Sequence, residues 1–359
     1  MKVAVTGGLG LLGRAVVDCL IDRGHTPVIV DRAVDRAVER AVEAGAAAQL
    51  TADVAHVQAD IRYPDQITAA FSGVDAVIHT ASLIDLHLGQ PASLHDVNVA
   101  GASNVVSACR HNRISKLVHM SSAEVISGTT PLRGITETES SYPEQQLTHY
   151  GLTKRGGEEA VLAAADEHLG TCAMRTYGMF GVGDNTVLPL YLKTLPGKSI
   201  MHMGDLKAES DLIFAPNLAF CLVLAVERLQ PDVDWSGTVF HVTDHEPVNV
   251  QRFLGQLVEP LGYNVVERFK IPRSVASTIA RFYETRYRVT GLERFARPPL
   301  TDHKLRLALD DYWLDSSRVR KVLSYEPPFS RAESIAATQE WLLATGGRRG
   351  NEPGDGTVV

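Results

Sequence analysis

Cysteine is scarce in this sequence and forms no recognisable metal or disulfide pattern. The four cysteines are Cys19, Cys109, Cys172 and Cys221, and no CxxC motif occurs. The 13 histidines likewise show no metal-ligand spacing. A zinc site, a thioredoxin-like motif and a disulfide-stabilised secreted fold are therefore not expected. We interpret the cysteines as buried free thiols in a reducing compartment.

Long apolar runs and an excess of basic residues are also missing. The best apolar candidate, residues 218–229, is shorter than the ~18 residues that a membrane span needs. The formal net charge is −7, from 35 Lys and Arg against 42 Asp and Glu, which argues against a nucleic-acid partner. The first predicted strand begins at residue 2, so we expect no signal peptide and a cytoplasmic protein.

The pattern that is present alternates short apolar strands with amphipathic helices. Hydrophobic residues make up 45% of the 359 residues, which is enough for a substantial core. The predicted strands are residues 2–5, 27–30, 54–58, 76–80, 116–122 and 171–175, and the predicted helices are residues 14–23, 64–71, 94–112 and 150–168. This alternation predicts an α/β fold with a doubly wound parallel sheet of the Rossmann type.

After residue 175 the pattern changes to short strands among segments rich in Gly, Pro and His. Only the helix 216–229 and the strand 238–242 resemble returns to the main sheet. We therefore predict an NAD-binding domain of residues 1–176 with 212–244, and a smaller mixed substrate lobe of residues 177–211 with 245–343. Three further segments are predicted: a surface helix at 33–48, an amphipathic lid helix at 268–297 and a disordered tail at 346–359.

A glycine-rich loop follows the first predicted strand. Gly7 permits a tight turn, Gly10 lets the backbone approach a pyrophosphate, and Gly13 lets the next helix pack close to the strand. The N-terminus of that helix then faces the phosphates. The order of strand, glycine turn, helix and strand predicts a dinucleotide site rather than a turn without a ligand.

Asp31 ends the second predicted strand, where a carboxylate can bind a ribose 2′-hydroxyl. A carboxylate there would repel a 2′-phosphate, so we expect NAD rather than NADP. Arg32 is the complication, because its guanidinium could pair with that phosphate. We interpret Arg32 as a solvated residue at the start of a helix.

Tyr150 and Lys154 are one turn apart on a predicted helix and so share a face. An ammonium near a phenol favours the phenolate. If Lys154 lowered the pKa of Tyr150 from ~10 by roughly three units, the phenol would be a usable acid or base at neutral pH. A lone pair of this spacing arises easily by chance, but after a dinucleotide loop a catalytic role is favoured over simple aromatic packing.

These motifs together resemble the extended short-chain dehydrogenase/reductase family, which typically uses the Gly-x-x-Gly-x-x-Gly loop. Two further runs are similar to its 3β-hydroxysteroid dehydrogenase and sterol-4-carboxylate dehydrogenase branch: His79-Thr-Ala-Ser-Leu-Ile-Asp-Leu86 and Met120-Ser-Ser-Ala-Glu-Val125. The resemblance covers residues 1–343. It is specific for the family and says little about the substrate.

The resemblance implies a role for each matching residue. Ser122 would hydrogen-bond the reacting oxygen, Tyr150 would be the acid/base, and Lys154 would also hold the nicotinamide ribose. Asn98 would support the active-site backbone, and Tyr177 would approach the nicotinamide. The residues expected at the cofactor are Gly7, Gly10, Leu11, Leu12, Gly13, Asp31, Arg32, Asp60, Ile61, Thr80, Ala81, Ser82, Asn98, Tyr150, Lys154 and Tyr177. His79 and His119 are expected to be satisfied core residues rather than catalysts.

The implied function is an NAD(P)-dependent interconversion of a secondary alcohol and a ketone on a bulky, hydrophobic small molecule, by a homodimer. One alternative is a sugar-nucleotide epimerase or dehydratase of the same family. Many such enzymes carry Arg where Ser210 precedes Asp211 here, and apolar residues such as Phe180 and Leu188 suit an apolar ligand or ordinary core. A further alternative is a non-catalytic dinucleotide sensor, although such relatives often lack the Tyr/Lys pair.

Overall fold

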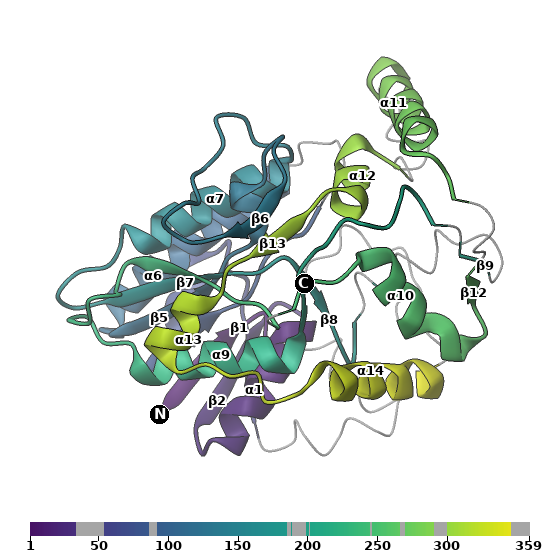
Figure 1. Ribbon diagram of the computed structural model, residues 1–359. Helices are drawn as coiled ribbons and strands as arrows, with labels where there is room; N and C mark the ends of the chain where they lie inside the picture. Colours follow the sequence, from purple (N-terminus) through teal and green to yellow (C-terminus); the bar gives the residue numbers. More distant parts are fainter. Residues whose placement is uncertain are drawn as a thin grey trace.

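The computed structural model describes residues 1–33, 54–85, 92–184, 188, 199–200, 202–244, 246–265, 270–290 and 300–345. Among these residues, seven parallel strands form one sheet in the order β11-β7-β5-β4-β1-β2-β3 (Figure 1). The strands are β1 (Lys2–Thr6), β2 (Thr26–Asp31), β3 (Ala55–Gln58), β4 (Ala76–His79), β5 (Lys116–Met120), β7 (Gly170–Arg175) and β11 (Thr238–His241). The predicted Rossmann-type sheet is therefore confirmed.

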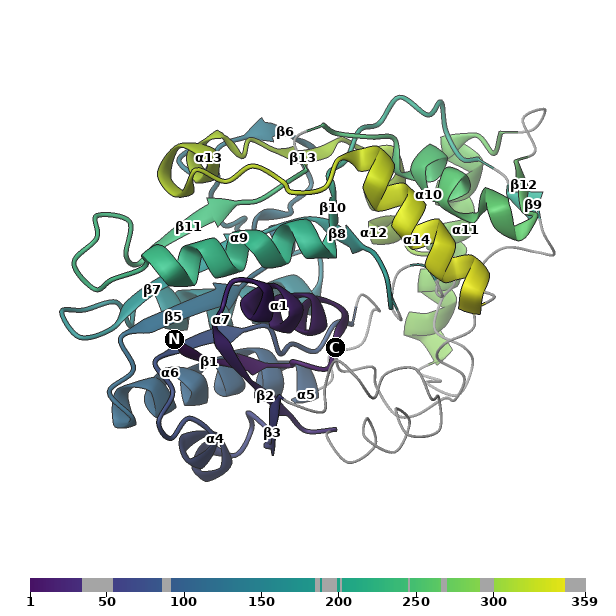
Figure 2. The same ribbon diagram turned by 90° about the horizontal axis from the view of Figure 1, so that it is seen from below.

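Helices cover both faces of this sheet (Figure 2). Helices α1 (Leu11–Asp22) and α9 (Ala215–Arg228) share one apolar core with Val3 and Val5 of β1. On the opposite face, Ala4 packs in a second core, whose helices are α4 (Pro64–Ala70), α6 (Gly101–His111) and α7 (His149–Leu162). Alternate residues of a strand point to opposite faces of the sheet. Because helices cover both faces, successive residues of a strand such as β1 are apolar.

Two predicted helices differ in detail from the structure. The helix predicted at 94–112 is a run of three pieces: α5 (Ala92–His95), a π-helical turn η1 (Asp96–Ala100) and α6. Helix α7 ends at Leu162 rather than at residue 168. The carboxylate of Asp166 accepts hydrogen bonds from the backbone N–H groups of His168 and Leu169, both at 2.9 Å, and closes a turn in place of a further helical turn.

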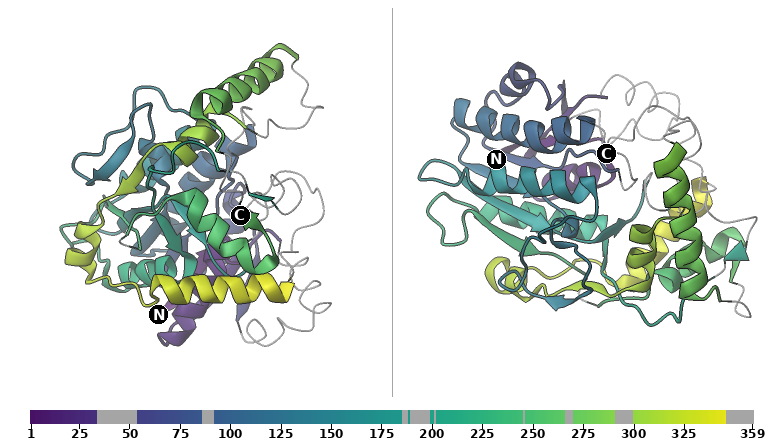
Figure 3. Two further views of the ribbon diagram at one scale, coloured as in Figure 1. Left: turned by 45° about the vertical axis from the view of Figure 1, so that its right-hand side comes forward. Right: turned by 90° about the horizontal axis from the view of Figure 1, so that it is seen from above.

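A smaller mixed lobe lies at the carboxyl ends of the strands (Figures 1 and 3). Its short strand pairs are β6–β13, β8–β10 and β9–β12, all parallel. The strands are β6 (Leu132–Ile135), β8 (Gly178–Phe180), β9 (Ser199–Ile200), β10 (Leu212–Phe214), β12 (Asn264–Val265) and β13 (Tyr312–Leu314). The helices of the lobe are α10 (Val250–Val258), α11 (Arg273–Thr290), α12 (Asp302–Leu309) and α14 (Arg331–Thr345), and α13 (Ser317–Leu323) follows β13. Figures 1 and 3 show α11 standing away from the sheet.

The segment after β13 packs on the main sheet. Val319, Leu323 and Tyr325 belong to the same core as α1 and α9. The boundaries of domain and lobe stay a prediction. This segment is predicted to belong to the lobe, although its side chains pack on the main sheet. The predicted surface helix, apart from residue 33, and the predicted tail lie outside the described residues.

The described helices include none that is long and apolar enough to cross a bilayer. In the described part of the chain no cluster of three metal-binding side chains occurs. The four cysteines are free thiols; Cys109, Cys172 and Cys221 are buried, as predicted, whereas Cys19 is partly exposed.

Asp211 directly precedes β10 and binds β13. Its carboxylate accepts a hydrogen bond from the backbone N–H of Leu314 at 2.6 Å. Burial raises the pKa of Asp211 to about 7, and the nearby charge of Asp244 adds to the rise. A folded-state pKa above the unfolded value means that protonated Asp211 stabilises the fold below pH ~4, and that this stabilisation is lost as the pH rises through 7.

We therefore expect Asp211→Asn to flatten the pH dependence of stability between pH 4 and 8. The wild type should lose, relative to the variant, on the order of 1 to 4 kcal/mol of unfolding free energy across that range. Urea denaturation at several pH values measures the difference, with the exposed Asp205→Asn as control. Parallel curves for wild type and Asp211→Asn would contradict this assignment.

Candidate active site

The glycine loop connects β1 to α1 at the carboxyl edge of the sheet. Gly7 has a φ of +69°, and a Cβ there would lie 2.8 Å from Cα of Ala81. A Cβ at Gly13 would lie 2.1 Å from the carbonyl oxygen of Gly7. Both positions therefore exclude side chains, because the turn and the helix–strand contact leave no room. Gly10 precedes the helix, and its N–H donates to the carbonyl of Gly7 at 2.9 Å.

The first turn of α1 supplies unpaired backbone donors. The side chains of Leu11 and Leu12 are buried in the sheet, so only their N–H groups can face a ligand. The first N–H groups of a helix have no partner within the helix and, with its dipole, favour an anion. The loop therefore fits a pyrophosphate.

Asp31 ends β2 beside this loop. One carboxylate oxygen accepts from the N–H of Leu9 at 3.2 Å, and the other accepts from the N–H of Ala33 at 3.0 Å. The side chain is partly exposed, so it can also accept from a ribose hydroxyl. Arg32 is exposed, as expected for a solvated residue.

Asp60 and Ile61 follow β3, and both are held by neighbouring side chains. Burial raises the pKa of Asp60, but hydrogen bonds from Arg62 outweigh it and hold the pKa below its ordinary value. Arg62 Nη2 lies 2.6 Å from Asp60 Oδ2. Ile61 packs on Gly101, where a Cβ would lie 2.6 Å from Ile61 Cδ1. The Asp60 carboxylate is thus already committed to Arg62.

Asn98 fixes the segment that follows β4. Its side-chain oxygen accepts from Ser82 Oγ at 3.1 Å and from Leu83 N at 2.9 Å, and its amide nitrogen donates to Thr153 on α7 at 3.1 Å. Asn98 lies in the π-helical turn, a feature often found at functional sites. Thr80 donates to the carbonyl of Thr6 at 2.7 Å and so binds this segment to β1.

Ser122 and Tyr150 come together at the carboxyl edge between β5 and α7. Ser122 precedes the short 3-10 helix η2 (Ala123–Ile126), and its oxygen accepts from the N–H of Glu124 at 3.2 Å. Tyr150 is in the first turn of α7 and only 7% exposed. Ser122 and Ser82 both lie close enough to Tyr150 for their side chains to lower the pKa of its phenol. The structure thus collects three hydroxyls where a substrate oxygen would be held.

Burial raises the pKa of Tyr150 above its ordinary value, and the charge of Glu124 adds to the rise, while Ser122 and Ser82 oppose it. This corrects the expectation that Lys154 lowers the pKa of the Tyr150 phenol toward neutral pH. The ammonium of Lys154 donates to the carbonyl of Met120 at 2.6 Å. Burial also lowers the pKa of Lys154 to about 8. Tyr150 is therefore a neutral phenol, ready to donate a proton.

Tyr177 faces the substrate lobe. Its ring stacks on Tyr312 with 5.5 Å between centroids, and its hydroxyl lies 3.5 Å from the carbonyl of Leu307 on α12. The ring also packs beside η2. Its approach to the nicotinamide stays a prediction.

The two core histidines behave differently. His79 shares a 2.6 Å hydrogen bond with Thr6, and burial lowers its pKa to about 3. Both ring nitrogens of buried His119 have no hydrogen-bond partner among the described residues. The expectation of a satisfied core residue is thus correct for His79 and wrong for His119.

Sequence reasoning missed two buried polar groups near the site. One is the ion pair of Glu158 and Arg175, which joins α7 to β7, and Glu158 also accepts a hydrogen bond from Ser121. The other is Glu124 with His303 of α12, 3.5 Å apart. The Ala-Glu-Val run drew attention to residue 124, but nothing in the sequence pointed to residue 303.

A backbone cradle for a dinucleotide and a buried group of hydroxyls beside a lysine meet at one edge of the sheet. This combination is typical of the short-chain dehydrogenases and reductases, and fold and site together define that class. The chain belongs within it to the 3-beta hydroxysteroid dehydrogenase/isomerase family, whose sequence profile matches residues 4–273. It is accordingly an oxidoreductase by family.

Individual relatives agree with this assignment. The chain is 31% identical over 352 residues to 3 beta-hydroxysteroid dehydrogenase/Delta 5-->4-isomerase of Mycobacterium tuberculosis, covering 93% of this chain and 88% of the relative. It is 28% identical over 339 residues to 2-alkyl-3-oxoalkanoate reductase of Stenotrophomonas maltophilia, covering 93% and 97%. Among solved structures, dTDP-glucose 4,6-dehydratase from Streptomyces venezuelae with NAD bound aligns with a TM-score of 0.70 at 20% identity, covering 97% of this chain and 98% of that one. The last likeness concerns the fold alone.

Proposed function

We propose that this protein is an NAD-dependent oxidoreductase that interconverts a secondary alcohol and a ketone on a bulky, hydrophobic substrate. The observation that carries the proposal is the meeting of Ser122, Ser82 and Tyr150 hydroxyls in a buried position. The glycine loop lies at the same edge of the sheet. Hydroxyl donors gathered beside a dinucleotide site suit a reaction at a carbon–oxygen bond.

The residues present fit NAD. The backbone at Gly7 to Gly13 would bind the pyrophosphate, and Asp31 would accept from the adenosine ribose. Lys154 would hold the nicotinamide ribose. When bound, the nicotinamide supplies the hydride acceptor or donor.

The protein's own task is to hold the substrate oxygen and to move one proton. In the reductive direction the neutral phenol of Tyr150 donates its proton to the carbonyl oxygen. Ser122 donates a hydrogen bond to the charge that develops there, an effect worth a few kcal/mol at typical sites. Lys154, with a pKa of about 8, carries a positive charge at neutral pH, and its ammonium donates to the carbonyl of Met120.

The preference for a hydrophobic substrate is supported by the family rather than by the lobe residues. Phe180 and Leu188 are buried in the core of the lobe with Phe214 and Phe253, so they do not argue for an apolar ligand. Three further apolar residues of the predicted lobe, Leu190, Tyr191 and Met201, lie outside the described residues. The two relatives described above are named for a hydroxysteroid and for an alkyl-oxoalkanoate.

The sugar-nucleotide alternative lacks local support at Ser210 and Asp211. The N–H of Ser210 donates to the carbonyl of Val248 at 2.8 Å, and the Asp211 carboxylate accepts from Leu314, so both residues are structural. A non-catalytic sensor would not need the buried hydroxyls.

The test is a panel of substrates, with NADH absorbance as the readout for ketones and chromatography of the products as the readout for nucleotide sugars. Hydrophobic ketones such as cyclododecanone and a 3-ketosteroid are compared with UDP- and dTDP-sugars. We expect NADH consumption with at least one ketone. Conversion of the nucleotide sugars alone would overturn the proposal in favour of an epimerase or dehydratase, and NADH binding without any turnover would favour a sensor.

Asp31→Asn should reduce the preference for NAD over NADP. Asn keeps an acceptor for Leu9 N but removes the charge that repels a 2′-phosphate. We expect NAD affinity to fall about ten-fold or more, because a hydrogen bond to a charged group contributes about 1.5–3 kcal/mol. Fluorescence titration with both dinucleotides measures the ratio, and the exposed Asp232→Asn is the control. An unchanged ratio would remove Asp31 from the cofactor site.

A homodimer is also proposed, with the outer face of α5, η1 and α7 as its interface. This face carries a shallow depression lined by Leu94, Val99 and Leu152, and Leu152 is 48% exposed. Light scattering on the purified chain distinguishes dimer from monomer. The cytoplasmic location stays a prediction.

A further inference from the structure

Glu124 and His303 form a buried acid–imidazole pair that the proposed mechanism does not use. Glu124 lies in η2, two residues after Ser122, and His303 lies in the first turn of α12. Each side chain is only 8% exposed. The pair thus joins the catalytic edge of the sheet to the substrate lobe.

The imidazole of His303 has unused hydrogen-bonding capacity. His303 Nε2 lies 3.5 Å from Glu124 Oε2, and Thr148 Oγ1 donates to the same oxygen at 3.4 Å. Both contacts are longer than a good hydrogen bond. Within the described residues neither ring nitrogen of His303 has a hydrogen-bond partner. Buried polar atoms without partners are costly, so their presence beside an active site points to a ligand.

The pair lies beside the proposed reacting oxygen. The N–H of Glu124 donates to Ser122 Oγ, and the Glu124 charge acts on the phenols of Tyr150, Tyr177 and Tyr312. Glu124 is thus in direct contact, through its backbone, with the serine proposed to hold the reacting oxygen.

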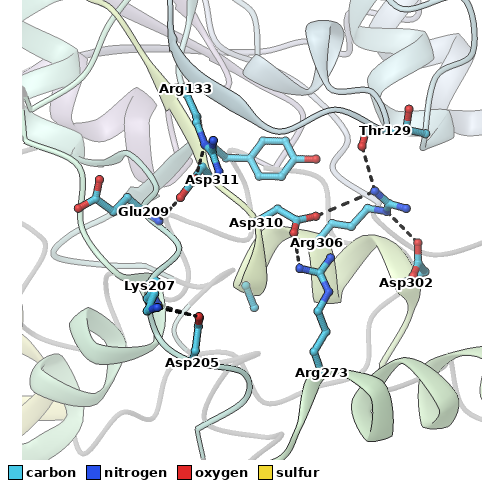
Figure 4. A network of polar contacts seen from close by, with 12 residues as sticks. Thr129, Arg133, Asp205, Lys207, Glu209, Arg273, Asp302, Arg306, Asp310 and Asp311 are labelled. Atoms are coloured by element: carbon cyan, nitrogen blue, oxygen red, sulfur yellow. Dashed lines mark hydrogen bonds and ion pairs between the residues drawn. The ribbon is translucent and has the colours of Figure 1, made fainter.

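A network of ion pairs fixes the helix that carries His303 (Figure 4). Arg306 of α12 binds Asp302 at 2.8 Å and donates to the carbonyl of Thr129, in the loop after η2, at 3.2 Å. Asp310 binds Arg273 of α11 at 2.6 Å and also approaches Arg306. Because this network binds α12 to the loop after η2, it keeps His303 close to Glu124. It supplies no hydrogen bond to the ring of His303.

We propose that Glu124 and His303 form a second polar subsite of the substrate pocket, which binds a second hydroxyl group on a carbon next to, or next but one to, the reacting carbon. This inference rests on the function proposed above and adds a substrate class: hydrophobic ring compounds that carry two neighbouring oxygen functions.

A hydroxyl group matches this pair chemically. Its proton would be donated to the Glu124 carboxylate, and its oxygen would accept from a ring N–H of His303. A substrate carboxylate would be repelled by Glu124, and a hydrocarbon would leave both groups unpaired. The subsite should therefore select neutral diols and hydroxyketones.

The experiment compares cyclododecanol with cyclododecane-1,2-diol. Oxidation with NAD gives kcat/KM for each, and calorimetry gives the binding of each alcohol to the protein–NADH complex, which cannot react with an alcohol. In the wild type the diol should exceed the mono-alcohol about ten-fold or more in both measurements, because a site that hydrogen-bonds a hydroxyl rejects the analogue without it.

Glu124→Gln and His303→Phe should each reduce the ratio of diol to mono-alcohol toward one. The ratio is used because Glu124 also acts on Tyr150, which changes both rates together. Glu144→Gln and His168→Asn, both exposed, are matched controls that should keep the wild-type ratio.

Three results would contradict the subsite. They are equal use of both alcohols by the wild type, a diol preference that survives in both variants, and a preference lost equally in the controls. Failure of the wild type to bind or oxidise either alcohol or any ketone of the panel would instead overturn the proposed function, and the subsite with it.

Discussion

Tyr150→Phe should lower kcat by about 10²- to 10⁴-fold and leave NADH binding within a few-fold of the wild type. The phenol is buried, and Ser122 and Ser82 both act on its pKa. Phe keeps the ring in its pocket and removes only the oxygen. Steady-state kinetics with a ketone of the panel gives kcat, and quenching of protein fluorescence by NADH gives the affinity.

Tyr263→Phe in the lobe is the matched control for this variant, because it also removes one phenolic oxygen. It should keep wild-type kcat. The pH profile adds a second readout: in the wild type, reduction requires the neutral phenol, whose pKa is raised by burial, so activity should persist well into alkaline pH. Near-normal turnover by Tyr150→Phe would remove Tyr150 from the mechanism.

Arg175→Met should destabilise the fold by about 3–5 kcal/mol, because it leaves a carboxylate buried without its counter-ion. Arg175 and Glu158 are joined by contacts of 2.6 and 2.9 Å, with side chains 5% and 0% exposed. Glu158 also accepts from Ser121 at 2.5 Å and from Tyr142 at 2.7 Å. The variant therefore also removes the ion pair that joins α7 to β7 next to the active site.

Urea denaturation measures this loss, and two further variants interpret it. Arg155→Met removes a partly exposed partner of Glu159 and should cost less than about 1 kcal/mol. Arg175→Met combined with Glu158→Gln should recover part of the loss, because no unpaired charge remains. A cost for Arg175→Met as small as that for Arg155→Met would show that the buried pair does not stabilise the fold.

Local patterns were sufficient for the cofactor half of the molecule. The strand β1, the glycines and Asp31 are close in sequence, and the sterics at Gly7 and Gly13 follow directly from the turn and the helix–strand contact. Asn98 could be placed by resemblance, but its hydrogen bonds to Ser82, Leu83 and Thr153 depend on a π-helical turn that no periodicity indicates.

The substrate side could not be predicted because its contacts are far apart in the sequence. Strand β13 pairs with β6, and His303 meets Glu124, through folding that a single sequence does not encode locally. The prediction that Lys154 lowers the pKa of Tyr150 was wrong for a related reason. Spacing tells that Lys154 shares a helix face with Tyr150, but it does not tell how deeply the phenol is buried or that the ammonium binds Met120.

The central claim is that this protein transfers a hydride between a nicotinamide and the carbinol carbon of a hydrophobic substrate. NADH with two deuterium atoms at C4 tests it directly, with cyclododecanone and a 3-ketosteroid as acceptors and mass spectrometry of the products. We expect one deuterium on the new carbinol carbon in the wild type and its loss in Tyr150→Phe. Hydride transfer to a ketone would be contradicted if NADH binds but no alcohol product carries deuterium. It would also be contradicted if the ketones stay unlabelled while nucleotide sugars are converted without net NADH consumption.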